Sequence, residues 1–83
     1  MSDDEIILGI MLRASLLPDD INVLKVMPDE MEVLQRCSTD EGWKSLRETT
    51  RRVCKTVLQR WAYYYRWNNA IGGYTSLAIE VVR

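Results

Sequence analysis

The stretch that decides the fold is DEGWKSLRETTRRVCKTVLQRWAYYYRW, residues 40–67. Apolar and small side chains recur along it at steps of three and four from Trp43 to Tyr64, which is the spacing of one helix face. Ser38 and Glu41 form a capping-box pattern before it, and Gly72 and Gly73 follow it, where a helix would stop. We therefore predict one long amphipathic helix over 40–67, about 42 Å long at 1.5 Å per residue.

At about 100° per residue, this predicted helix has an apolar side and a basic side. The side chains expected in the core are those of Trp43, Leu46, Thr50, Val53, Cys54, Val57, Leu58, Trp61 and Tyr64. The cations on the opposite side, here called the basic arc, are Lys44, Arg51, Arg52, Lys55 and Arg66. Tyr63 and Trp67 lie on the flank, so we expect them to present aromatic rings at the surface.

A first helix is predicted over residues 3–16. Ser2 and Glu5 have capping-box spacing, and Pro18 follows the last turn. Apolar residues cover nearly the whole circumference of this helix, so it needs burial on all sides. A second subunit would supply that burial, with Ile6, Ile7, Ile10 and Met11 as the oligomer interface. The alternative is a central helix wrapped by its own chain.

Shorter elements complete a mainly α fold, predicted as one domain over residues 1–83. Pro28 suits the first turn of a short helix over 29–37. Residues 21–27 are rich in β-branched side chains, and residues 74–82 alternate in polarity, so both are predicted as short strands. A short helix remains the alternative for each of these two segments. The length of 40–67 and the apolar first helix together favour a dimeric helical assembly.

Charge is divided unequally between the two halves of the chain. Residues 1–41 contain ten acidic and three basic side chains, a net charge of −7. Residues 42–83 contain eight basic and two acidic side chains, a net charge of +6. Such asymmetry is typical of proteins that bind a charged partner. The alternative is that the two halves neutralise each other, within one chain or across a dimer.

The residue types present exclude most enzymatic chemistry. Histidine is absent, so imidazole can be neither base nor metal ligand, and no glycine-rich phosphate loop occurs. Cys37 and Cys54 lack the spacing of a zinc site and lie on apolar helical positions, which predicts buried, reduced thiols. Pairs of neighbouring acids such as Asp19 and Asp20 lie at turns or helix starts, where they suit the helix dipole. We predict no catalysis, no metal site and no cofactor.

These observations predict a non-enzymatic interaction protein, an adaptor or small structural protein. It would self-associate through its first helix and present the basic arc to an acidic partner. The alternative is a nucleic-acid-binding protein whose basic arc contacts phosphates, with Tyr63 and Trp67 stacking on bases. The start, Met1 to Glu5, is acidic, where a signal peptide would be basic, and no transmembrane segment is visible. The expected location is the cytoplasm or nucleus, and no small-molecule substrate is expected.

Overall fold

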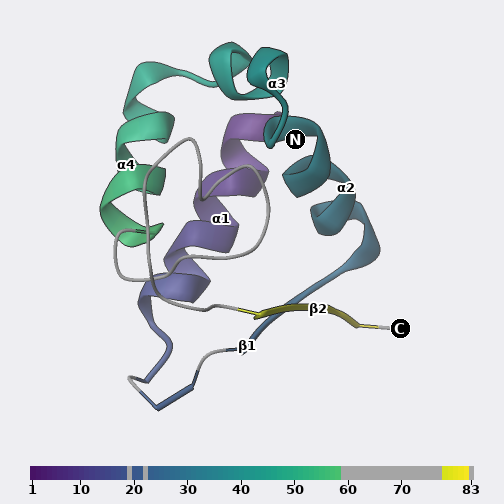
Figure 1. The fold of residues 1–83 in the computed structure, drawn as a ribbon, viewed down its shortest axis with the longest axis vertical. Helices are drawn as coiled ribbons and strands as arrows, with labels where there is room; N and C mark the ends of the chain where they lie inside the picture. Colours follow the sequence, from purple (N-terminus) through teal and green to yellow (C-terminus); the bar gives the residue numbers. More distant parts are fainter. Residues whose placement is uncertain (19, 22, 59–77, 83) are drawn as a thin grey trace.

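The central helix of the fold, α1, has α2 on one side and α4 on the other (Figure 1). The computed structural model describes residues 1–18, 20–21, 23–58 and 78–82. In these residues the elements follow one another as α1 (Asp3–Ser15), β1 (Val23–Val26), α2 (Pro28–Cys37), α3 (Asp40–Ser45), α4 (Glu48–Leu58) and β2 (Ala78–Val81). The predicted mainly helical fold is confirmed.

Local capping explains where α1 begins. The Glu5 backbone N–H donates to Ser2 Oγ at 3.3 Å, and three acids occupy the first turn, where the helix dipole favours them. The inward side of the helix, Ile7, Ile10, Met11 and Ala14, is buried against neighbouring elements of the same chain. The predicted helix over 3–16 is confirmed. The chain thus covers this side of its first helix itself, whereas Leu8, Leu12 and Leu16 stay exposed.

The two strands pair with each other over a long sequence separation. β1 and β2 run parallel, and their register sets Val23 opposite Ala78 and Val26 opposite Val81. Leu24 and Val26 are buried. The strand predicted over 21–27 is confirmed for Val23–Val26. The one predicted over 74–82 is confirmed for Ala78–Val81, whereas residues 74–77 lie outside the described residues.

The start of α2 also follows from local sequence. Pro28 occupies the first helical turn, and the Met27 N–H donates to Glu30 Oε1 at 2.8 Å. Proline needs no donor partner there, and the carboxylate takes up one of the free N–H groups at the helix start. The predicted helix over 29–37 is confirmed.

The single helix predicted over 40–67 is wrong, because the chain breaks at Leu46 and Arg47 into α3 and α4. Leu46 has an extended backbone (φ −71°, ψ 148°) and a side chain only 3% exposed. The Arg47 N–H donates to Asp4 Oδ2 at 2.9 Å, so the break is stabilised by a carboxylate of α1. Residues 59–67 of the predicted helix lie outside the described residues.

The predicted cap of this segment is wrong by one residue. Thr39, not Ser38, is the N-cap of α3, since Thr39 Oγ1 accepts the Gly42 N–H at 3.0 Å. The Ser38 hydroxyl instead donates to the Gln35 carbonyl at 2.7 Å, at the end of α2. Because α2 ends at Cys37 and α3 begins at Asp40, each hydroxyl finds a partner at a helix end. Thr39 has the extended backbone of an N-cap residue, so its hydroxyl caps α3.

Candidate functional site

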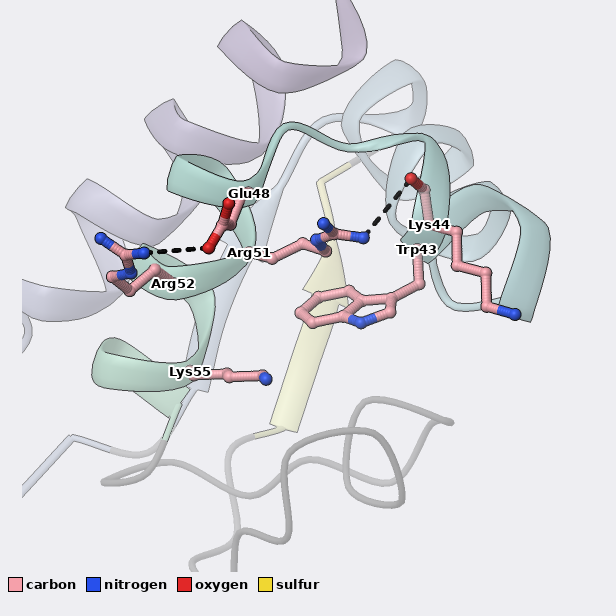
Figure 2. Close-up of a pocket in the computed structure, with 6 residues that line it drawn as sticks. All are labelled: Trp43, Lys44, Glu48, Arg51, Arg52 and Lys55. Carbon is pink, nitrogen blue, oxygen red and sulfur yellow. Dashed lines mark hydrogen bonds and ion pairs between the residues drawn. The ribbon is translucent and has the colours of Figure 1, made fainter.

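Four cations of the basic arc lie around one surface depression, here called the basic hollow. It has a volume of about 560 Å³ and lies between α3 and α4. The residues that line it are Trp43, Lys44, Glu48, Arg51, Arg52 and Lys55 (Figure 2). Because the chain breaks at Leu46, α3 and α4 form two walls of this hollow instead of one continuous rod.

Side chains from the two walls reach toward each other. Arg51 extends from α4 toward α3, and the Trp43 indole extends from α3 toward α4 (Figure 2). Arg51 Nη1 donates to the Lys44 carbonyl at 3.5 Å, a long hydrogen bond. Lys55 lies one turn further along α4 than Arg51. The hollow therefore combines an aromatic ring with cations from both helices.

Most of these cations have no carboxylate partner among the described residues. Arg52 pairs with Glu48 one turn earlier, at 3.1 Å, and both side chains are exposed. No ion pair within 4.0 Å involves Lys44, Arg51 or Lys55 in the described part of the chain. Within that part of the chain, no ion pair neutralises their positive charge.

Two acids of the first half, Glu30 and Asp3, form ion pairs with bases of that same half. Arg13 forms a bidentate pair with Glu30 at 2.7 and 2.9 Å, and Arg36 forms one with Asp3 at 2.8 and 3.0 Å. Because an arginine donates these hydrogen bonds to each carboxylate, the pKa of Glu30 and the pKa of Asp3 lie below their usual values. Among the described residues, then, no ion pair joins the acidic half to the basic arc.

The other predicted site residues fall in two groups. Tyr63, Arg66 and Trp67 lie outside the described residues. The predicted oligomer interface lies mostly inside the chain: Ile7, Ile10 and Met11 are fully buried in its own core, and Ile6 packs on that core. They are covered because α2 and α4 flank α1. The exposed apolar side chains of this segment are Leu8 and Leu12 on α1 and Leu16 at its C-cap.

Two positions of the basic hollow were not foreseen from the helical pattern. The pattern predicts Trp43 in the core, whereas the structure leaves its side chain partly buried against the core and lining the hollow, and nothing in the pattern predicts Glu48 there. Val53 also differs, since it is exposed although the pattern placed it in the core. The apolar spacing holds on both sides of the break, since Leu46, Thr50 and Cys54 are all buried, so no local sequence signal marks the break at Leu46.

Both thiols are buried and free, as predicted. Cys37 and Cys54 have no exposed surface in the described fold. Burial raises the pKa of the Cys37 thiol to about 11 and that of Cys54 to about 12, with nearby Asp3 adding to the rise at Cys37 and the Cys37 thiol to that at Cys54. These are the surroundings of packed side chains, since reactive cysteines need a stabilised thiolate.

Both thiols should therefore react slowly with a maleimide while the protein is folded. At pH 8 a thiol of pKa about 11 is ionised roughly 100-fold less than an ordinary cysteine, so labelling should be slower by at least about that factor. Mass spectrometry of timed samples measures the rate, and the same reaction in denaturant gives the unprotected rate. Fast labelling of Cys54 in the folded protein would contradict the structural role.

Comparisons of the chain with protein families, curated proteins and solved structures found no match. Across the described residues, none of the helices combines the length and apolar character needed to cross a bilayer. Nor do any three of the described His, Cys, Asp or Glu side chains come together as a potential metal site. The basic hollow is the described surface that concentrates unpaired charge beside an aromatic ring.

Proposed function

We propose that this protein is a non-enzymatic adaptor that binds an acidic segment of a partner protein in the basic hollow. The observation that carries the proposal is the set of three cations, Lys44, Arg51 and Lys55, without a carboxylate partner among the described residues. Exposed ion pairs contribute little to folding, so stability alone gives no reason to gather like charges here. A carboxylate-bearing partner would relieve their mutual repulsion.

The residue types that line the hollow favour a protein partner. Arginine and tryptophan are the residue types that most often dominate binding energy at protein interfaces, and here they come from two helices that face each other. Glu48 on the wall accepts a hydrogen bond from Arg52 at 3.1 Å. A continuous phosphate backbone would meet this carboxylate, whereas a peptide can place a cation or an amide there.

Nucleic acid is the second candidate, and the Trp43 indole is the observation that favours it. A ring beside cations can stack on a base while the cations meet phosphates. Three cations set a limit on this alternative: log affinity should fall with log salt at a slope no steeper than about −3.

Titration of labelled probes with the full chain tests the proposal. The probes are a fluorescein-labelled 12-residue peptide of Glu, Asp and Leu, mixed-sequence DNA, and mixed-sequence RNA, each at two salt concentrations. Arg51→Glu combined with Lys55→Glu should weaken binding of the acidic peptide at least about tenfold, or 1.4 kcal/mol. Circular dichroism should stay unchanged, because neither side chain lies in the core.

A matched pair of lysines provides the control. Lys55→Gln and Lys25→Gln remove the same charge from exposed residues, but Lys25 lies on β1, away from the basic hollow. Lys55→Gln should weaken the peptide several-fold, and Lys25→Gln should leave it unchanged. Equal loss in both variants would show only a general charge effect. Tighter binding of DNA or RNA than of peptide would support the second candidate.

The predicted homodimer stays a prediction. The exposed apolar residues that would contribute to it are Leu8 and Leu12 on α1 and Leu16 at its C-cap. Sedimentation at micromolar concentration should give about twice the chain mass of 9.7 kDa, and a monomer would contradict it.

A further inference from the structure

A second depression, of opposite charge, lies between α1 and the start of α2. It has a volume of about 550 Å³. Its walls include Ile6, Gly9 and Arg13 on α1 and Met27, Asp29 and Glu30 around the start of α2. We call it the Gly9 groove. None of these residues belongs to the basic hollow.

Gly9 is a glycine that packing among the described residues does not require. It lies in the middle of α1, where glycine costs about 1 kcal/mol relative to alanine. Among the described residues, a Cβ at this position would have no heavy atom within 4 Å beyond its immediate neighbours and the helix's own backbone. The helix thus gives up stability without an internal gain, and the bare backbone leaves room for another chain to approach α1 closely.

Adaptable apolar side chains flank this opening. Met27 is 52% exposed, and Ile6 is partly buried against the core. Methionine is flexible and polarizable, and it is common in grooves that accept the apolar face of a helix. The walls of the groove therefore offer an apolar surface of the kind that an amphipathic helix covers.

Apart from the pair of Arg13 with Glu30, the groove is lined by the carboxylates of Glu5 and Asp29 and by Met1 with its terminal ammonium, a net charge of −1. Arg13 is neutralised by its bidentate pair with Glu30. Glu5, which also lines the groove, accepts a hydrogen bond from the Ser2 hydroxyl at 3.3 Å, but neither Glu5 nor Asp29 has an ion pair within 4.0 Å among the described residues. A cationic occupant would complement these two carboxylates.

We infer that the Gly9 groove docks a basic amphipathic helix of a partner protein. Its apolar face would lie on Ile6 and Met27, its backbone would approach α1 at Gly9, and its Lys or Arg side chains would meet Glu5 and Asp29. In helix-in-groove recognition, apolar side chains at helical spacing on the bound helix pack into the groove. Together with the basic hollow, this surface would let one small chain hold two partners of opposite charge.

A designed peptide tests the inference with the full chain. The probe is a fluorescein-labelled 14-residue helix of Leu and Lys, with Leu at positions i, i+3, i+4 and i+7. Gly9→Leu fills the groove and should weaken this peptide at least tenfold in fluorescence anisotropy. The same variant should melt at a higher temperature than the parent, because leucine favours the helix and meets open space. Lost binding in a more stable protein cannot be a failure to fold.

Charge reversal supplies the second arm. Glu5→Lys with Asp29→Lys should weaken the peptide at least tenfold, whereas Glu32→Lys with Glu41→Lys makes the same charge change outside the groove and should alter binding less than twofold. Unchanged binding by Gly9→Leu, or equal binding of a peptide with scrambled Leu and Lys, would overturn the inference. A dimer of the free protein that Gly9→Leu dissolves would also overturn it, by identifying a second copy as the occupant. Arg51→Glu should leave this peptide unaffected, so the two surfaces are tested separately.

Discussion

Alanine in place of Gly42 should destabilise the protein by about 3 kcal/mol and lower its melting temperature by roughly 15 °C. Gly42 lies in the first turn of α3, directly against the end of α2. A Cβ there would collide with the Arg36 carbonyl group and lie 2.9 Å from Cys37 Cα. These obstacles are backbone atoms, so no side chain can rotate away.

The surrounding hydrogen bonds prevent an easy adjustment at Gly42. The Arg36 carbonyl accepts the Thr39 hydroxyl at 2.8 Å, and Thr39 Oγ1 in turn accepts the Gly42 N–H at 3.0 Å. Making room for a methyl group would separate α3 from α2 and break this turn. Trp43 would move with α3, so binding to the basic hollow should weaken as well.

Gly9→Ala is the matched control for Gly42→Ala. Both variants add one methyl group to a helical glycine, but the space at Gly9 is open. Gly9→Ala should therefore stabilise the protein by up to about 1 kcal/mol. Denaturant unfolding followed by circular dichroism measures both. A Gly42→Ala variant as stable as the parent would show that α2 and α3 are not in such close contact.

Removing the Asp4 carboxylate is the second change with a large expected effect. Asp4 Oδ2 accepts the Arg47 N–H at 2.9 Å and the Thr50 hydroxyl at 2.7 Å, and Thr50 is only 1% exposed. Asp4→Ala leaves a buried hydroxyl and a helix-start N–H without this partner. We expect a loss of about 2–3 kcal/mol in the free energy of unfolding, since each unsatisfied group costs about 1–3 kcal/mol.

A double-mutant cycle isolates this interaction. Thr50→Val removes the hydroxyl with little change in shape, so Asp4→Ala should cost less in a Thr50→Val background than in the parent. Additive costs would contradict the proposed link between the start of α1 and the start of α4. Arg47 keeps its backbone N–H in every variant, so the part of the loss that persists in the Thr50→Val background includes that hydrogen bond.

The same carboxylate gives stability a dependence on pH. The Thr50 hydroxyl and then the Arg47 N–H lower the pKa of Asp4 below its ordinary value of 3.8. A group with a lowered folded-state pKa stabilises the protein above its unfolded pKa and loses that contribution as the pH falls through its folded value. Unfolding free energy should therefore fall with acid below about pH 4, and less steeply in Asp4→Asn. Asp3 and Glu30, whose pKa values are also lowered, account for the slope that remains.

Elements whose ends depend on neighbouring residues were predictable from sequence. Ser2 with Glu5 begins α1, and Pro28 begins α2, because capping and proline geometry act within one turn. The cations of the basic hollow were also predictable as a charged helical surface. Lys44, Arg51, Arg52 and Lys55 do line one depression, although it is shaped by two helices instead of one.

The break at Leu46 and Arg47 could be decided only by tertiary structure. Apolar spacing continues through it, since Leu46 and Thr50 are both buried with or without a continuous helix. What stabilises the new helix start is Asp4, on α1, which is distant in sequence. Sequence separation also explains why the sequence alone left two alternatives for the burial of α1. The apolar circumference of α1 predicted burial, but only the packing of the chain showed that α2 and α4 supply much of it. Periodicity thus determined which side chains avoid water, and long-range contacts determined where the chain bends and which surfaces remain open.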